Sequence, residues 1–124
     1  RNASARVSDV LVLGKPLGVG VMSAALKKSQ LTEEAYAQML KATTQLNTPG
    51  PELATMAGVH ALTDVTGFGL AGHGLELARA AEVDVHIDWS QVPLLPGVRA
   101  LAQAGQSLVL TATNLVCSCL LYFP

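Results

Sequence analysis

The hydrophobic pattern in the first half of the chain predicts one strand followed by helices. Residues 7–13 form a short apolar run rich in Val and Leu, which is typical of a buried strand. Residues 19–28 combine small apolar side chains with two lysines at the end, as a helix does. A clearer helix begins at Thr32, a good N-cap ahead of two glutamates, and a further short helix is expected over residues 52–57. The apolar face of the clearer helix is expected to hold Tyr36, Met39, Leu40 and Leu46.

In the second half of the chain, strand and helix patterns alternate. Residues 59–62 predict a strand, residues 63–69 a polar, glycine-rich turn, and residues 70–82 a helix. Residues 83–89 alternate apolar and polar side chains, as a strand with one wet face does, and residues 97–105 predict a short helix. This alternation favours a sheet covered by helices. The side chains expected to face inward from the long helix are Leu70, Leu75, Leu77 and Ala78.

The composition narrows the classes of protein to which the chain can belong. Its 124 residues suit one domain at most, on a prior of roughly 100–200 residues per domain. Hydrophobic residues make up 50% of the chain and charged residues only 14%, which excludes a disordered coil. The net charge of −1 provides no basic field, so we expect neither nucleic acid nor a membrane as a partner.

The charged residues are unevenly placed along the chain. All eight basic and nine acidic side chains lie between Arg1 and Arg99, so the last part of the chain carries no charge. The apolar stretch at residues 108–123 is shorter than the roughly 20 residues of a membrane span. Within it, Cys117 and Cys119 have a spacing that suits neither a disulfide nor a zinc site. We expect two small apolar side chains there and a reducing, cytoplasmic origin.

The strand, turn and helix over residues 59–82 are the candidate functional site. The strand brings Asp64 to its carboxyl end, where open α/β sheets usually bind ligands. The glycines after it let the backbone approach a ligand, and the start of the next helix offers free N–H groups to an anion. A carboxylate beside such a turn suggests a Mg²⁺ ion that bridges to phosphate oxygens. The turn could instead be structural, with Asp64 or Thr66 capping the next helix.

Other polar residues are weaker candidates for chemistry. Lys15 follows the first strand and could reach a phosphate, although a lysine at a turn is more often a surface residue. His86 lies on the polar face of its strand and is expected to be solvated, whereas His73 is expected to pack. The spacing of the sequence supports no serine–histidine–aspartate arrangement.

Two segments of the chain resemble a known family. Residues 9–18 match the pattern D-V-L-V-L-T-K-P-L-G except at Gly14, where the family has threonine. Residues 61–73 match A-[ML]-T-D-V-T-G-F-G-L-x-G-H throughout. Both motifs resemble those of selenophosphate synthetase (selenide, water dikinase), and the resemblance covers about residues 2–105.

The resemblance implies an α+β fold with helices packed on a mixed sheet. Family members have two domains, and the chain is similar to part of the second domain, of the type shared with aminoimidazole ribonucleotide synthetase. Residues 1–105 are expected to be an incomplete copy of that domain. In the family, the first domain carries the catalytic Cys or selenocysteine, the dimer interface and much of the ATP site.

The resemblance also implies an activity. The family transfers phosphate from ATP to selenide, using water, and forms selenophosphate, AMP and free phosphate. Asp64 matches the family's magnesium-binding aspartate, and the other metal aspartates belong to the first domain. We therefore expect Mg²⁺, ATP and selenide as ligands of a homodimeric parent enzyme. The chain alone is expected to be inactive, because one aspartate cannot hold the metal.

Residues 106–124 depart from the family pattern. The glycine-rich turn, the arginine–asparagine pair and the D-P-Q-T-S-G-G-L motif expected there are absent, and an apolar tail stands in their place. We expect a frameshift or a misread gene end to be the cause. Two other functions stay open: a relative in the same superfamily, such as thiamine-monophosphate kinase, or a non-catalytic α+β fragment that binds or regulates a full-length partner.

Overall fold

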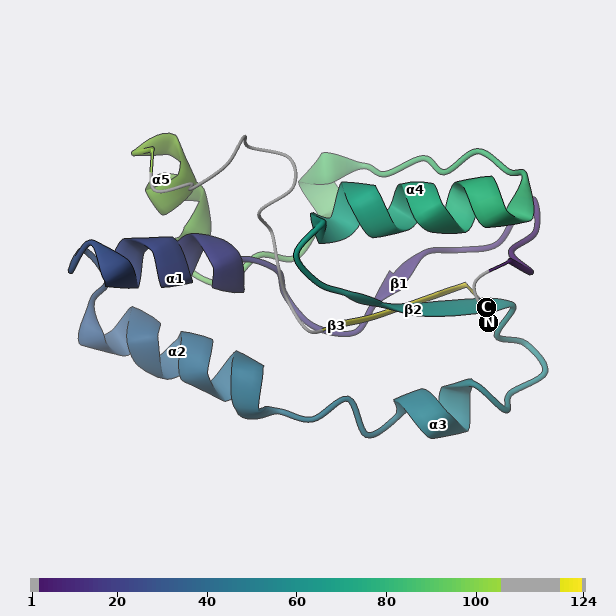
Figure 1. Ribbon diagram of the computed structural model, residues 1–124, viewed down its shortest axis with the longest axis horizontal. Helices are drawn as coiled ribbons and strands as arrows, with labels where there is room; N and C mark the ends of the chain where they lie inside the picture. Colours follow the sequence, from purple (N-terminus) through teal and green to yellow (C-terminus); the bar gives the residue numbers. More distant parts are fainter. Residues whose placement is uncertain (1–2, 106–118, 124) are drawn as a thin grey trace.

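In the part of the chain that the structure describes, the sheet has three strands, and helices pack on it. The computed structural model describes residues 3–105 and 119–123. The strands lie in the order β1-β3-β2, and both neighbouring pairs are antiparallel, with residues 61–65 paired in order with residues 123–119. The predicted α+β class is therefore confirmed (Figure 1). The strand bounds are β1 Val12–Leu13, β2 Ala61–Val65 and β3 Cys119–Phe123.

The helices lie close to their predicted positions. The patterns at residues 19–28, 70–82 and 97–105 each form a helix. The short helix expected over residues 52–57 instead spans residues 50–53, so it begins two residues earlier and ends four residues earlier than predicted. Thr32 is the N-cap as predicted, because its hydroxyl accepts a hydrogen bond from the Ala35 N–H at 3.2 Å. The bounds are α1 Val19–Lys27, α2 Glu33–Thr44, α3 Gly50–Leu53, α4 Gly69–Ala81, the 3-10 helix η1 Trp89–Gln91, and α5 Val98–Gln103.

The longer helices form two groups. α4 packs on β2 and runs alongside the strands, whereas α1 contacts both α2 and α5 at the other end of the molecule (Figure 1). Leu17 connects the loop before α1 to the segment before α5. Its N–H donates to the Pro93 carbonyl at 2.9 Å, and its own carbonyl accepts the Leu95 N–H at 2.8 Å. This parallel bridge connects the chain entering α1 to the chain entering α5, within the group formed by α1, α2 and α5.

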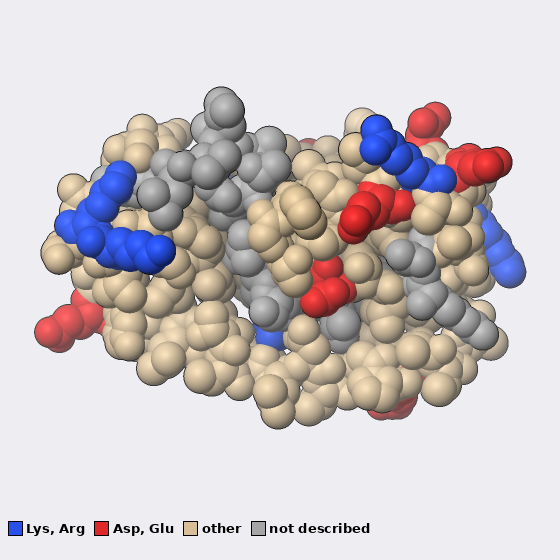
Figure 2. Space-filling model, viewed as in Figure 1, with Lys and Arg blue, Asp and Glu red and all other residues tan. Residues whose placement is uncertain are grey.

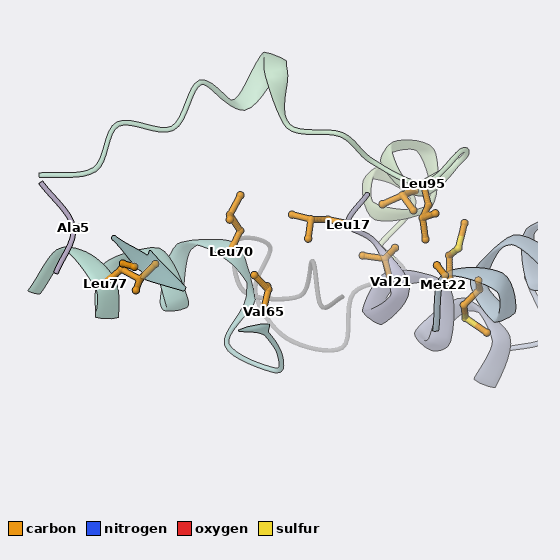
Figure 3. Close-up of a cluster of buried hydrophobic side chains, with 12 residues drawn as sticks. Ala5, Leu17, Val21, Met22, Val65, Leu70, Leu77 and Leu95 are labelled. Atoms are coloured by element: carbon orange, nitrogen blue, oxygen red, sulfur yellow. The ribbon is translucent and has the colours of Figure 1, made fainter. Parts of the chain in front are cut away.

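The buried core runs through both groups as one cluster. The side chains of Leu17, Val65 and Leu77 are fully buried, and they come from three different parts of the chain. Burying each such side chain stabilises the fold by about 1.5–3 kcal/mol. Figure 3 shows the cluster with the following residues labelled: Ala5, Leu17, Val21, Met22, Val65, Leu70, Leu77 and Leu95.

The predicted apolar face of α2 is wrong in part. Met39 is buried as expected, but Tyr36 and Leu40 are 42% and 47% exposed, and Leu46 is 75% exposed. α2 packs against α1, and the buried positions of α2 are Met39 and Ala42, three residues apart. The contact stripe is therefore narrower than the set of apolar residues along the helix. The larger side chains lie outside it.

The predicted strand at residues 83–89 is not part of the sheet. Residues 83–88 are extended but belong to no strand of the described chain, and residue 89 begins η1. The predicted alternation is nevertheless present, because the apolar side chains of residues 83–88 are half-buried and the polar ones are exposed. A period-two pattern specifies the two faces of an extended backbone, not its hydrogen-bonded neighbour. Similarly, within the described residues only Val12–Leu13 of the predicted strand at residues 7–13 is paired.

Candidate functional site

Asp64 is the next-to-last residue of β2. The strand continues to residue 65, beyond the predicted end at residue 62, so Asp64 lies in the strand itself. Val65 beside it is fully buried and anchors this end of β2, whereas the Asp64 side chain is exposed. Among the described residues, the Asp64 carboxylate has no hydrogen-bond or ion-pair partner. Its oxygens can therefore bind a ligand from outside this part of the chain.

The turn after β2 leads into α4 without a side-chain cap. The Gly69 N–H donates to the Thr66 carbonyl at 2.9 Å, and the N-cap residue of α4 is Phe68. The alternative in which Asp64 or Thr66 caps this helix is therefore wrong. A strand that extends through residue 65 leaves the helix to begin at Gly69, too late for either side chain to occupy the N-cap.

The Thr66 hydroxyl instead belongs to a line of three polar groups. Thr66 Oγ1 lies 3.0 Å from His73 Nε2, and His73 Nδ1 lies 3.0 Å from a carboxylate oxygen of Glu76. His73 is only 7% exposed, and its ring meets the edge of the Phe68 ring at a centroid distance of 5.9 Å. His73 therefore packs, as predicted, and it also faces the turn. Leu75, which was expected to face inward, is 49% exposed.

The line of Thr66, His73 and Glu76 was not predicted. The sequence does contain a signal for it, because His73 and Glu76 are three residues apart and share one face of α4. The other partner of His73 is Thr66, which lies in the preceding turn. The path of the chain from β2 into α4 brings the Thr66 hydroxyl within hydrogen-bond distance of the ring. His86, by contrast, is exposed as predicted.

A second unpredicted pair joins Asp9 to His60. His60 Nδ1 lies 2.9 Å from both carboxylate oxygens of Asp9, and the Arg6 backbone N–H donates to the same carboxylate at 2.8 Å. Burial raises the pKa of Asp9, but the hydrogen bonds from Arg6 and His60, with their positive charges, outweigh it. The pKa of Asp9 is therefore lower than its ordinary value of 3.8. This pair ties the segment before β1 to the segment before β2.

We expect the Asp9 pair to make folding stability depend on pH in the acid range. Because the pKa of Asp9 is lowered on folding, its contribution is fully present above pH 3.8 and is lost as the pH falls through the folded value. Asp9→Asn should flatten the fall in stability below pH 3.8, as measured by chemical denaturation at a series of pH values. Asp84→Asn, at an exposed aspartate, is the control. An equal flattening in both variants would contradict the assignment.

Lys15 takes neither of its two predicted roles. It is buried at 7% exposure, so it is not a surface residue. Its ammonium group donates to the carbonyl of Gln45 at 2.5 Å and approaches that of Ala42 at 3.5 Å, so it is not directed at a phosphate. Both carbonyls lie at the C-terminus of α2, where a positive charge is favourable. Lys15 therefore caps the C-terminus of α2 and links it to the loop before α1.

We expect Lys15→Met to destabilise the fold. The substitution keeps most of the buried side-chain volume but leaves the carbonyls at the end of α2 without their charged donor. Losing hydrogen bonds to a charged group costs about 1.5–3 kcal/mol. Chemical denaturation of the chain measures the change. The control is Lys27→Met, at an exposed lysine in the last turn of α1, which should cost less than about 1 kcal/mol. Equal losses in the two variants would show that Lys15 has no special role.

The surface shows no field of one sign on the face in Figure 2. Lys and Arg side chains and Asp and Glu side chains lie there in small separate groups. Within residues 3–105 and 119–123, no three or more His, Cys, Asp and Glu side chains form a group that could hold a metal ion. No helix in this part of the chain has the length and apolar character needed to cross a membrane. Of the tail predicted over residues 106–124, residues 106–118 and 124, with Cys117, lie outside the described residues, whereas residues 119–123 form β3, the middle strand of the described sheet.

The sequence of the chain matches a known protein family and named relatives. The profile of the family described as "AIR synthase related protein, C-terminal domain" matches residues 6–114. A selenide, water dikinase of Pseudomonas straminea is 64% identical over 105 residues, which cover 85% of this chain and 29% of that protein. A selenide, water dikinase of Burkholderia orbicola is 62% identical over the same length and is covered to 30%. The chain thus spans less than a third of the length of these relatives.

Two solved structures have a similar fold. Both are crystal structures of E. coli HypE, one of them described as a hydrogenase maturation protein. The chain aligns with them at TM-scores of 0.75 and 0.78, with sequence identities of 23% and 25%. Each alignment covers 99% of this chain, and 36% or 37% of the other. The sequence predicts that the family resemblance ends near residue 105. The family match continues to residue 114, so this boundary stays a prediction.

Proposed function

The chain belongs to the family of the AIR synthase related C-terminal domain, and from this premise we propose that it is a segment of a selenide, water dikinase. The proposed reaction of the whole parent converts selenide, ATP and water into selenophosphate, AMP and phosphate. The named relatives support this substrate class, because they share up to 64% identity with the chain. The chain covers about 30% of their length, so the activity belongs to the parent and not to this segment alone.

The observation that carries the proposal is the exposed carboxylate of Asp64. It lies at the carboxyl end of β2, one residue before a glycine-containing turn, and no described side chain occupies its oxygens. Mg²⁺ is a hard cation that binds one or two carboxylates together with phosphate oxygens and water. The donor chemistry of Asp64 therefore fits one position in the coordination shell of a magnesium ion bound to ATP.

The segment's own contribution to the reaction is binding and orientation. Asp64 supplies one negative ligand, and the buried Val65 beside it fixes the strand end that holds this ligand. Mg²⁺, when bound, would neutralise charge on the phosphate oxygens during transfer. The remaining carboxylates, the nucleophile and most ATP contacts come from the rest of the parent in this proposal. We place that parent in the cytoplasm as a homodimer and expect no activity from the isolated segment.

A chimera tests the proposal directly. The 105 matched residues of this chain replace their counterpart in the Pseudomonas straminea selenide, water dikinase, with which they share 64% identity. We expect the purified chimera to form AMP from ATP, and to do so only when selenide and Mg²⁺ are present. Chromatography of the nucleotides gives the ratio of AMP formed to ATP consumed.

The product nucleotide separates this proposal from the other functions. ADP as the final product, formed without selenide, would favour a small-molecule kinase such as thiamine-monophosphate kinase. A folded chimera that consumes no ATP would favour a segment with a binding or regulatory role. Either result would overturn the proposed function.

A further inference from the structure

The line of Thr66, His73 and Glu76 ends one residue beyond the strand that holds Asp64. Its two hydrogen-bond distances are both 3.0 Å, from Thr66 Oγ1 to His73 Nε2 and from His73 Nδ1 to Glu76. The central ring is buried, while Thr66 is exposed and the Glu76 side chain is 62% exposed. The arrangement thus connects a solvent-facing carboxylate on α4 to a hydroxyl at the candidate site.

The chemistry of the end groups fixes the position of each proton. A carboxylate only accepts hydrogen bonds, so His73 Nδ1 carries a proton and donates it to Glu76. In the neutral ring the other nitrogen, Nε2, is then an acceptor. With a neutral ring, Thr66 therefore donates its hydroxyl proton to His73. Its oxygen lone pairs are left free on the side away from the ring.

The Asp64 carboxylate is a near neighbour of this hydroxyl along the chain. The buried Val65 separates the exposed Asp64 from the exposed Thr66. Both oxygen-bearing side chains therefore reach solvent at this strand end. A hydroxyl that has given its proton to an inward acceptor can only accept, or bind a cation, on its outward side.

We propose that Thr66 supplies a neutral oxygen ligand to the divalent cation bound by Asp64, and that His73 and Glu76 are positioning residues that keep the hydroxyl proton turned away from the metal. The proposal rests on the proposed function only in taking Asp64 as a metal ligand. A hydroxyl oxygen beside a carboxylate is a suitable donor pair for a hard cation such as Mg²⁺. A hydrogen-bonded residue behind a ligand commonly orients it.

The exposure of Glu76 argues against a purely stabilising role for this line. An ion pair with so exposed a partner contributes little to stability. Its clear effect is to select which nitrogen of His73 carries the proton. The His73 ring is buried and makes a T-shaped contact with the Phe68 ring, and its other nitrogen faces Thr66, so this selection is passed on to Thr66. Each group in the line therefore has a definite part in orienting one oxygen.

Nitrogen-15 NMR of the full chain, recorded above neutral pH, tests the proton positions. We expect the His73 ring to carry its proton on Nδ1 in the unsubstituted chain. Glu76→Ala removes the acceptor, so the Nε2–H form should appear. Glu52→Ala, at an exposed glutamate of α3, is the control and should leave the ring unchanged. A proton on Nε2 in the unsubstituted chain, in either the neutral or the charged ring, would overturn the proposal, as would an unchanged ring in Glu76→Ala.

Titration of the chimera with Mn²⁺ alone tests the ligand itself, because the other carboxylates of the metal site come from the rest of the parent in the proposed function. Broadening of the amide signals of Val65 and Gly67 reports a paramagnetic ion nearby. We expect Thr66→Val to raise the Mn²⁺ concentration needed for half-broadening about tenfold. Thr66→Ser keeps the hydroxyl and should stay within about twofold of the unsubstituted chimera. Asp64→Asn should abolish the broadening. Amide signals far from the turn confirm that each variant is folded.

The outcomes separate this inference from the proposed function. If Asp64→Asn removes the broadening while Thr66→Val has no effect, the Thr66 inference fails and the metal role of Asp64 stands. If Asp64→Asn leaves the broadening unchanged, or the unsubstituted chimera shows none, both the Thr66 ligand and the Asp64 metal site are contradicted.

Discussion

Asp64→Asn should reduce selenide-dependent AMP formation by the chimera about a hundredfold or more. The substitution keeps the size of the side chain but removes the negative charge and one strong oxygen donor. A divalent ion that stabilises charge on a transferring phosphate depends on each of its few carboxylate ligands. Because Asp64 is exposed at the end of β2, the variant should fold normally. Initial rates of AMP formation at a series of Mg²⁺ concentrations measure the effect.

The matched control for this substitution is Asp84→Asn. Asp84 is also exposed, but it lies in the extended segment after α4 and has no place in the candidate site. We expect its rate to equal that of the unsubstituted chimera. A hundredfold loss that disappears at high Mg²⁺ would indicate weakened metal binding, which the proposal requires. Activity near that of the control in Asp64→Asn would contradict a metal-binding role.

Gly18→Ala should cost about 3 kcal/mol or more of folding stability. Gly18 precedes α1 with a φ of 128°, which L residues rarely adopt, and a Cβ atom there would lie 2.3 Å from Val98 Cγ2. Val98 is 1% exposed at the start of α5, so its side chain has little space to move. Backbone strain of about 1–3 kcal/mol adds to an overpacking cost of similar size. The close approach of α1 to α5 therefore requires a glycine.

Substitutions at two other glycines separate the cost of backbone strain from the cost of overpacking. Gly97 has a φ of 78° but an open site, so Gly97→Ala should show the backbone strain alone, about 1–2 kcal/mol. Gly58 has neither a positive φ nor a neighbour within 4 Å, so Gly58→Ala should change stability by less than about 0.5 kcal/mol. Chemical denaturation of all three variants gives the comparison. Equal losses in Gly18→Ala and Gly97→Ala would show that contact with Val98 contributes nothing.

Local patterns predicted the helices better than the strands. The caps and periodicity around Thr32 and over residues 70–82 depend on neighbouring residues only, and both helices formed as expected. Pairing of a strand depends on a distant segment, and here both β1 and β2 pair with residues 119–123. The sequence of residues 83–89 contains no information on whether such a partner exists. The predicted strand there therefore formed as an extended segment outside the sheet.

The candidate site was predicted for its carboxylate but not for its surroundings. Asp64 could be placed because a strand end followed by glycines is a local feature of the sequence. Its neighbour Thr66 was considered only as a cap, and the contact with His73 depends on how the turn folds back onto α4. Lys15 was assigned by the character of its loop, although the carbonyls it binds lie 27 and 30 residues away. Contacts of this kind arise from packing, which periodicity does not encode.

The most direct test of the account is the identity of the phosphorus product made by the chimera. With selenide enriched in selenium-77, phosphorus-31 NMR distinguishes a phosphorus–selenium bond by the splitting of the signal. We predict a split selenophosphate signal, together with AMP and free phosphate, and about a hundredfold slower formation of both the split signal and AMP by the Asp64→Asn chimera. An unsplit phosphate signal as the only new resonance, from a folded chimera that consumes ATP, would contradict the account.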